Sequence, residues 1–476
     1  MTKLSEQEQV AIRGGSSATA LLHDLVIDSM QRYPDTFAHL TPPDERRFRR
    51  GYPDFLASFE AARLAGPDVS AIAMGLVEGL KQRIVWGADE QPLSEALASA
   101  VAPLPLQSTT LPGTAGWRAQ VSLADRDWQL ATADDLGQQL SQANLVSEWV
   151  ADAFAWLTTS AGATRQADGT MRLDLSGRKI AMLGAGAEMA PTKHWLEAGA
   201  QVLWLDTNPP PPDWQHANLA GRLWWSSTPV DLLRQPGAVL ATLLEFADGS
   251  PLDLGLYAYA PGQAREVRLT CAMNALVDAL PHDLISSVTM LISPTTPTAL
   301  SAAGRQRMAD RLAQRPAWEA VCDALGLVGR GGGAALSESA ATTRTVVGIQ
   351  GASYQAAQYI GKLLTAQCWA AQGLRVSANT AAITRTRSLA HPVFAAAFGG
   401  ARAMGVQTMS PAQSQCLNGL LAVHDWLQPE LPAPGRGGVH GGLHYLPYPL
   451  QSALRVAAAI GFARRPALLG GLLSRG

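Results

Sequence analysis

One stretch in the middle of the chain constrains the fold more than any other. Residues 180–183 form an uninterrupted apolar run, as expected of a buried parallel strand, and Gly184 and Gly186 follow it at once. Residues 191–198 then show a helical pattern, and residues 201–205 form a second apolar run. A strand, a glycine turn, a helix and a second strand in this order predict a β-α-β unit.

The turn of this unit has the residues that a nucleotide requires. Gly184 permits a tight turn, and Gly186 has no side chain to keep a pyrophosphate away from the backbone. Asp206 ends the second strand about 20 residues after Gly186, where it can accept hydrogen bonds from both ribose hydroxyls of an adenosine. Because a carboxylate would repel a 2′-phosphate, the pattern favours NAD over NADP. The helix N-terminus is expected to attract the phosphates.

Two alternatives stay open at this turn. The third glycine of the usual G-x-G-x-x-G pattern is replaced by Met189, although Ala190 can make the close contact between helix and strand instead. S-adenosylmethionine methyltransferases also combine a glycine turn with a ribose-binding acid, and their third glycine would fall at Glu188. A turn that binds no nucleotide is the other alternative. The residues expected to contact the cofactor are those of the turn and its acid: Gly184, Gly186, Glu188, Met189 and Asp206.

The composition narrows the class of protein. The chain has 476 residues, enough for about two to four domains. Only 16% of the residues are charged, against about 25% in an average protein, so we expect a large buried core. The formal charge of −2 gives no electrostatic reason to expect a nucleic acid partner. There is no signal-peptide pattern and no apolar run of about 18 residues, so a cytoplasmic protein without an integral membrane segment is expected.

The pattern of helices and strands predicts four regions. They are a mainly helical domain at 1–112 that ends in a proline-rich linker at 103–112, a bridging region at 113–176, a nucleotide-binding domain at 177–390 with a helical insertion at 301–344, and a helical extension at 391–476 with a glycine-rich loop. Strands alternating with helices predict a parallel sheet with helices on both faces. Beyond residue 206, we expect strands at 239–244, 254–260, 285–293, 345–350 and 374–378, and helices at 213–234, 264–280 and 354–372.

The nucleotide-binding region resembles a divergent short-chain dehydrogenase/reductase. Residues 353–359 (Ser-Tyr-Gln-Ala-Ala-Gln-Tyr), the long helix after them and residues 372–379 are similar to the Tyr-x-x-x-Lys helix of that family and its following strand. Asn274 resembles the asparagine of the preceding helix, and Ser293 lies where the family keeps its catalytic serine. The resemblance covers roughly residues 178–385 and implies an α/β fold with a Rossmann-like doubly wound parallel sheet.

The resemblance also implies a chemistry. Tyr354 would exchange a proton with a carbonyl oxygen, Ser293 would fix that carbonyl, and a cation would lower the pKa of the tyrosine. The family's lysine position is Gln358 here, whereas Lys362 lies two helical turns after Tyr354 on a similar face. The expected function is an NAD(P)-dependent oxidoreductase that acts on a carbonyl or alcohol group of a small substrate. The alternatives are the methyltransferase and, because of Gln358, an inactive nucleotide-binding or scaffold protein.

The C-terminal region offers further candidate features. His440 and His444 lie in the glycine-rich loop at 435–445, where a metal would need a third ligand, so no metal site is predicted. His424 and Asp425 are further candidate acid–base groups. The apolar tail at 450–476 is expected to pack on the domain or on a second subunit rather than on a membrane surface, which allows for a homo-oligomer.

Overall fold

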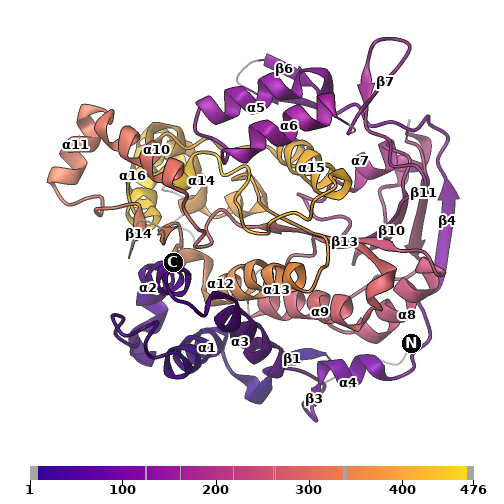
Figure 1. Ribbon diagram of the computed structural model, residues 1–476, viewed down its shortest axis with the longest axis horizontal. Coiled ribbons are helices and arrows are strands. Elements are labelled where there is room, and N and C mark those ends of the chain that lie inside the picture. The colour runs from indigo at the N-terminus through magenta and orange to yellow at the C-terminus, as the bar shows by residue number, and fades with distance from the viewer. Residues whose placement is uncertain are drawn as a thin grey trace.

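A seven-stranded sheet lies at the centre of the computed structural model (Figure 1), which describes residues 9–468 except 124–125, 161, 218, 261, 263 and 336–339. The strand order is β16-β13-β12-β9-β10-β11-β4. Six strands are parallel, and their bounds are β9 (Lys179–Leu183), β10 (Gln201–Leu205), β11 (Arg222–Ser226), β12 (Leu252–Leu256), β13 (Ile285–Ile292) and β16 (Val376–Thr380). The edge strand β4 (Leu106–Thr110) pairs antiparallel with β11.

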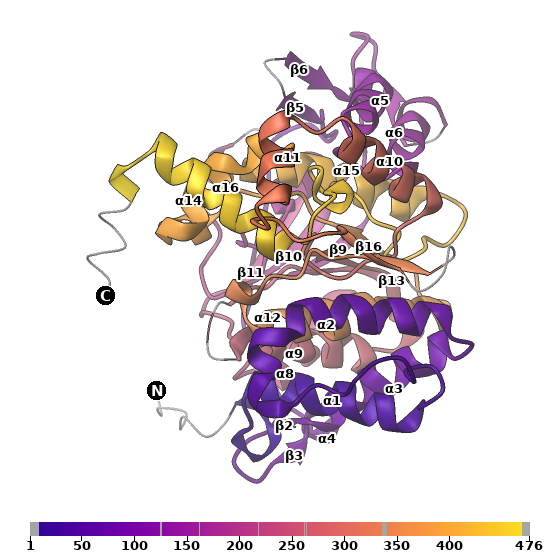
Figure 2. The same ribbon diagram turned by 90° about the vertical axis from the view of Figure 1, so that its left-hand side faces the viewer.

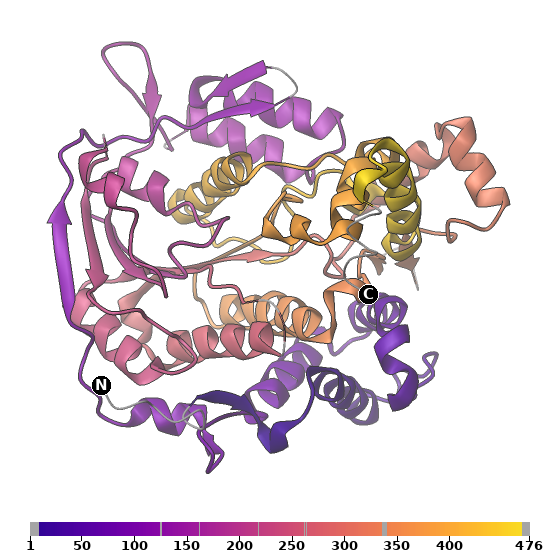
Figure 3. The same ribbon diagram turned by 180° about the vertical axis from the view of Figure 1, so that it is seen from behind.

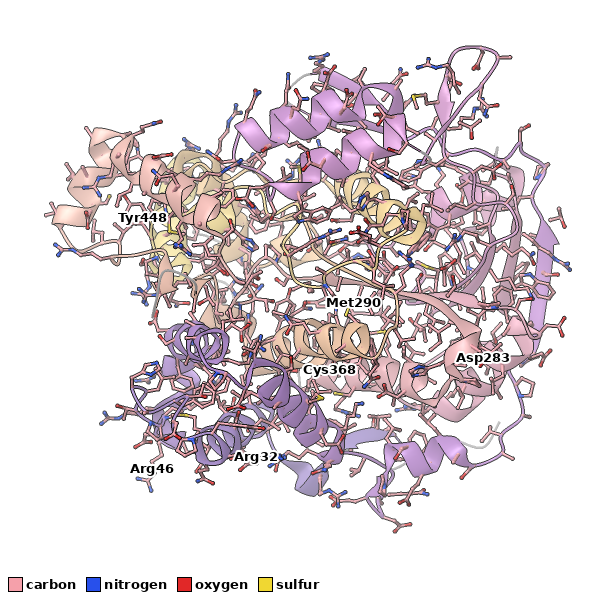
Figure 4. The ribbon with its side chains drawn as sticks, in the orientation of Figure 1. Arg32, Arg46, Asp283, Met290, Cys368 and Tyr448 are labelled. Atoms are coloured by element: carbon pink, nitrogen blue, oxygen red, sulfur yellow. The ribbon has the colours of Figure 1, made fainter. Side chains whose placement is uncertain are left out.

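Helices cover both faces of this sheet, as predicted (Figure 1). One face carries α8 (Pro236–Ala247), α9 (Arg265–Ala279) and a continuous helix made of α12 (Ala352–Gln355), a π-helix (Ala356–Leu364) and α13 (Thr365–Ala371). The other face carries α7 (Thr192–Glu197), α6 (Trp149–Thr159) and α15 (Pro411–Leu427), with α5 (Ala133–Gln142) packed on α6. The side-chain view places Met290 of β13 in the sheet and Cys368 of α13 in the layer beneath it (Figure 4).

The strands divide their side chains between two hydrophobic cores. In β9, Ala181 and Leu183 belong to the core beneath the sheet, whereas Ile180 and Met182 belong to the core above it. Alternate residues of a strand point to opposite faces, so a strand buried on both faces is apolar throughout. This explains why the central strands read as uninterrupted apolar runs in the sequence.

The N-terminal helices form a further layer beneath the helices of the lower face (Figure 2). These are α1 (Ala18–Arg32), α2 (Glu45–Ala65), α3 (Val69–Gln82) and α4 (Leu93–Ala98), with a small sheet of β1 (Val10–Ile12), β2 (Ile84–Trp86) and β3 (Gln91–Pro92). Their apolar side chains belong to the same hydrophobic core as the lower face of the sheet. A buried ion pair between Glu60 and Arg63 receives a 2.6 Å hydrogen bond from the Tyr359 hydroxyl of the π-helix, which ties α2 to this face.

The remaining elements flank the sheet (Figure 3). Helix α14 (Pro392–Ala401) packs closely on α16 (Leu450–Arg464), because Gly400 and Gly461 leave no side chain between the two backbones. The other elements are α10 (Ala302–Ala313), α11 (Ala317–Ala324) and the hairpins β5 (Gln120–Leu123) with β6 (Arg126–Gln129), β7 (Thr164–Arg165) with β8 (Met171–Arg172), and β14 (Gly333–Ala335) with β15 (Ala341–Thr343). Among the described residues, no helix is long and apolar enough to cross a bilayer.

Four predicted elements are wrong. The linker expected at 103–112 contains β4, because its Ser- and Thr-rich residues pair with β11 at the exposed edge of the sheet. The helix expected at 213–234 is replaced by a 3-10 turn and β11, so this strand takes the third place in the chain order. The strand expected at 239–244 is part of α8, which has Pro236 in its first turn. The strand expected at 345–350 is irregular and ends in a 3-10 turn.

Candidate functional site

The glycine turn lies between β9 and β10, where Gly184 has a φ of +86°. A Cβ atom on Gly184 would collide with the backbone of Ala258, which leaves the end of β12 at this point. A Cβ atom on Gly186 would lie 3.1 Å from the Trp204 ring and face the Asp206 carboxylate. Gly184 is therefore required by the close approach of β9 to the end of β12, whereas the exposed Gly186 leaves little room for a side chain beside Trp204 and Asp206 of the β10 end.

The Asp206 carboxylate holds the turn in place. Its Oδ2 accepts a 3.0 Å hydrogen bond from the backbone N–H of Gly186, and its Oδ1 accepts one of 3.0 Å from the backbone N–H of Asn208. Oδ1 also accepts a 3.3 Å hydrogen bond from the Thr207 hydroxyl and one of 3.5 Å from the Asn208 side-chain amide, so the half-buried Asp206 has room for a further donor mainly at Oδ2. Gly186 itself is exposed, so a ligand can approach the turn.

The expected contribution of a helix N-terminus is not found. After Gly186 the chain makes a second turn, in which Ala190 donates a backbone hydrogen bond of 2.9 Å to Ala187. Helix α7 begins only at Thr192 and has 6 residues, so its N–H groups do not follow directly on the glycines. Any phosphate held here would depend on the backbone of the turn rather than on a helix dipole.

The remaining turn residues contact the loop that follows β16. The Glu188 carboxylate accepts a 3.2 Å hydrogen bond from the backbone N–H of Arg387, and its backbone carbonyl accepts one of 2.8 Å from Gln415 on α15. Met189 is half-buried beside it. The glycine turn therefore lies under segments that come much later in the chain.

A second polar group of side chains lies at the ends of β12 and β13. The backbone N–H of Ser293 donates a 2.9 Å hydrogen bond to Gln358, and the Ser293 hydroxyl is 2.7 Å from that of Thr295. Tyr354 is half-buried beside Ser293; its partial burial raises the pKa of the tyrosine, and its hydrogen bond to Ser293 opposes that rise. At neutral pH the Tyr354 hydroxyl therefore keeps its proton and can act as a donor.

A buried carboxylate and a buried ammonium adjoin this group. Glu266 is 3% exposed; burial raises its pKa to about 7, although the positive charge of Lys362 lowers it. One of its oxygens accepts a 3.1 Å hydrogen bond from the backbone N–H of Ala260, and the other has no hydrogen-bond partner among the described residues; a hydrogen bond from Gln358 to the carboxyl also lowers its pKa. Lys362 donates a 3.3 Å hydrogen bond to the carbonyl of Leu291, and burial lowers its pKa. The positive charge of Lys362 acts on the Glu266 carboxylate.

The π-helix and α9 meet along a polar seam. Glu266, Thr270 and Asn274 form one stripe of α9 at four-residue spacing, and all three are buried. The Asn274 amide donates a 2.7 Å hydrogen bond to the carbonyl of Gly361, and a Cβ atom on Gly361 would collide with Thr270. Asn274 thus anchors the π-helix instead of facing Tyr354. Single π-turns are frequent at functional sites, and here the π-helix carries both Gln358 and Lys362.

The two groups of predicted residues lie on the same edge of the sheet. Tyr257 and Ala258 follow β12, and their backbone N–H groups donate hydrogen bonds to the carbonyl of Leu183, next to Gly184. The ring of the next residue, Tyr259, lies 6.5 Å from the ring of Tyr354. Since neighbouring strands are about 4.8 Å apart, the ends of β9 and β13 are separated by about 10 Å across β12. The turn and the Ser293–Tyr354 pair are therefore neighbours.

The sequence did not identify Glu266 as a candidate site residue. Helix α9 has a strong apolar face, and a single acid in its first turn is ordinary on a helix surface. The available signal was the four-residue spacing of Glu266, Thr270 and Asn274, which places all three on one side of the helix. A helix packed between a sheet and other helices is covered on several sides, so a polar stripe on it predicts buried polar contacts.

The other candidate acid–base groups have structural partners. Asp425 accepts hydrogen bonds from Ser377, Asn379, His424 and Arg436, at 2.7–3.0 Å, which fixes α15 and the glycine-rich loop to β16. His440 and His444 are stacked with ring centroids 4.6 Å apart and are both buried. Among the described residues, no group of three or more His, Cys, Asp or Glu side chains is arranged to hold a metal.

The buried histidines predict an acid-sensitive fold. Burial lowers the pKa of His444 to about 4, below the value of about 6.5 in the unfolded chain. The unfolded state therefore binds more protons between pH 6.5 and 4, and the free energy of unfolding should fall by about 3 kcal/mol as the pH drops through that window. Urea denaturation of the wild type and of His444→Gln should show a shallower decline in the variant. Parallel pH profiles would contradict the assignment.

Comparison of the sequence with known proteins identifies no family for the chain. A search of protein-family models finds none that matches the chain, and a search of curated proteins finds no significant match.

Proposed function

We propose that the protein is an NAD-dependent oxidoreductase that acts on a carbonyl or alcohol group of a small molecule. The observation that carries the proposal is the position of the glycine turn in the sheet. Counted along the chain, the six parallel strands lie in the order third, second, first, fourth, fifth and sixth, with the turn after the first. This is the order of a Rossmann-like sheet, in which the dinucleotide lies where the strand order reverses. Here that point is between β9 and β12.

The residues at this point fit the cofactor. The exposed Gly186 leaves the backbone of the turn open, and the Oδ2 atom of Asp206, which accepts one hydrogen bond from Gly186, has room for a ribose hydroxyl. A carboxylate at this position disfavours a 2′-phosphate, so NADP is the weaker candidate. When bound, NAD would supply or accept the hydride.

Tyr354 and Ser293 would handle the proton on the substrate oxygen. The Tyr354 hydroxyl is protonated at neutral pH and can donate to a carbonyl oxygen, while the Ser293 hydroxyl orients that oxygen. Because a protonated tyrosine donates a proton, these roles favour reduction of a carbonyl over oxidation of an alcohol. Glu266, with a pKa of about 7, is a group that can exchange protons near neutral pH beside the tyrosine.

One observation favours a second candidate, a nucleotide-binding protein without catalysis. Gln358 occupies the position of the family's lysine and is engaged with the backbone of Ser293, and Lys362 is engaged with Glu266 and Leu291. In that case the tyrosine has no cation to promote its ionisation, and the protein would bind NAD without turning over a substrate.

Thermal unfolding with added ligands tests the proposed class. NADH should raise the melting temperature, NADPH should raise it less, and S-adenosylmethionine should leave it unchanged, because only a ligand that binds the folded state stabilises it. Stabilisation by S-adenosylmethionine alone would point to a methyltransferase, and no shift with any of the three would overturn the proposal.

A further inference from the structure

A cavity of about 350 Å³ lies beside α10, where this helix approaches the end of α5. Figure 2 shows α10 close to α5 and α6. Ligand sites have volumes of about 300–1,000 Å³, so the cavity is large enough for a small molecule. The side chains that line it are mostly polar, and they include Arg307, Arg311, Arg315, Asn144, Gln314 and Asp310. Because the arginines outnumber the acid, the lining attracts anions.

Two of the arginines stand one helical turn apart. Arg307 and Arg311 are separated by four residues on α10, which places them on the same side of the helix and about 6 Å apart along its axis. Arg315 follows the end of the helix and lines the same cavity. Like charges at four-residue spacing repel one another. A bound anion would relieve this repulsion, so the arrangement favours a ligand of negative charge.

Arg307 makes its contacts with neutral groups. Its guanidinium donates hydrogen bonds of 2.8 Å and 3.2 Å to the carbonyl and the hydroxyl of Ser141, and one of 3.3 Å to the side-chain oxygen of Asn144. It also lies 5.5 Å from the centre of the Tyr445 ring. None of these acceptors carries a negative charge. The contacts therefore fix the guanidinium at the cavity wall without compensating its charge.

The other two arginines are held by acids of α11. Arg311 forms a 3.3 Å ion pair with Glu319, and Arg315 forms one of 3.0 Å with Asp323. Each pair uses one hydrogen bond from the guanidinium, which has five N–H donors in all. Neither acid is among the residues that line the cavity. The acids thus orient the two guanidinium groups, and each group keeps donors for a ligand.

We propose that this cavity binds a small molecule with two or more anionic groups, either phosphates or carboxylates. The planar fork of a guanidinium matches the paired oxygens of both groups. Arginines one helical turn apart suit a ligand whose anionic groups are separated by a few ångströms, so a single small anion would contact the site only in part. The inference is independent of the oxidoreductase proposal, because the cavity shares no residue with the glycine turn or with the Ser293–Tyr354 pair.

The size of the cavity and the charge of the chain make a nucleic acid the less favoured ligand. Nucleic acids are bound along extended basic surfaces that contact many phosphates. The chain has a formal charge of −2, and the arginines line a single cavity of about 350 Å³. A small polyanion fits these properties better.

Calorimetric titration of the full chain with tripolyphosphate, citrate and inorganic phosphate at low ionic strength tests the proposal. Tripolyphosphate or citrate, which carry several anionic groups, should bind at least about tenfold more tightly than inorganic phosphate. Added salt should weaken the binding, because it screens the attraction between charges. Binding of tripolyphosphate alone would assign phosphate compounds to the site, and binding of citrate alone would assign polycarboxylates.

Two variants of the lining locate the bound anion. Gln314 is exposed and makes no side-chain hydrogen bond with the described residues, so Gln314→Glu adds a negative charge to the cavity without breaking a contact. Arg307→Gln removes a positive charge. Each variant should weaken binding by at least about tenfold. Ala309→Glu is the matched control, because it adds the same charge at an exposed position of α10 outside the lining. Circular dichroism checks that all three variants fold.

Three outcomes would overturn the proposal. The wild type could bind none of the three anions. Alternatively, Gln314→Glu could keep the affinity of the wild type, which would place the bound anion elsewhere, as at the glycine turn. In the third outcome, Ala309→Glu would weaken binding as much as Gln314→Glu does. That result would show that the net charge of the molecule, rather than the cavity, determines the affinity.

Discussion

Replacing Lys362 with methionine is expected to lower the free energy of unfolding at pH 8 by about 1 kcal/mol, because a carboxyl with a pKa of about 7 can take up a proton when its cation is lost. The change leaves the Glu266 carboxylate buried without its cation, and one of its oxygens already has no hydrogen-bond partner among the described residues. At pH 6 the loss should be much smaller. The pKa of Glu266 is about 7 with Lys362 in place and must rise further without it, so at pH 6 the carboxyl becomes neutral by taking up a proton.

Urea denaturation at the two pH values measures this effect. The double variant Glu266→Gln/Lys362→Met should recover most of the loss at pH 8, because it removes both charges together. Lys193→Met serves as a control on an exposed lysine and should change the stability little. An equal loss at pH 6 and pH 8 would show that Lys362 acts through packing rather than through its charge.

Replacing Tyr354 with phenylalanine is expected to lower the turnover of a carbonyl substrate by about 10²–10⁴-fold. The change removes the hydroxyl that lies beside Ser293 and leaves the ring in place. The affinity for NADH should stay nearly the same, because the cofactor residues are those of the glycine turn. Steady-state rates from a panel of aldehydes and ketones, together with NADH titrations, measure the two effects separately.

Tyr33→Phe provides the control for this variant, since Tyr33 follows α1 in the N-terminal layer and should leave both quantities unchanged. If Tyr354→Phe kept full turnover, the tyrosine would have no part in the reaction, and Glu266 would become the candidate proton donor. If no carbonyl compound were reduced by the wild type while NADH still bound, the non-catalytic alternative would be favoured.

The central sheet could be predicted largely from local sequence. Residues 179–183 and 201–205 lie in strands buried on both faces, so their apolar runs carry a strong signal. An apolar run is ambiguous, however, when the element is short. Residues 239–244 have the same character, but they lie in α8, and only Pro236 in its first turn indicates a helix. β4 carries no such signal, because an edge strand can be polar.

The site could be predicted only in part, because much of it depends on contacts between distant segments. The glycine turn and Asp206 form a local pattern, and the structure places them at the reversal of strand order. Ser293 and Tyr354 were paired only through the family resemblance. The coupling of Lys362 to Glu266 was not predictable, since it depends on how the π-helix packs on α9.

Calorimetric titration of NADH and NADPH into the wild type and Asp206→Asn tests whether the glycine turn and Asp206 bind the nucleotide. Asparagine removes the charge and keeps an acceptor for the backbone N–H of Gly186, at the loss of the acceptor for Asn208, and circular dichroism checks that the variant is folded. The wild type should prefer NADH; the variant should bind NADH at least about tenfold more weakly and NADPH more strongly. Asp213→Asn, on an exposed acid nearby, should behave like the wild type. A wild type that binds neither nucleotide, or a variant with unchanged affinities for both, would contradict the nucleotide site at the glycine turn.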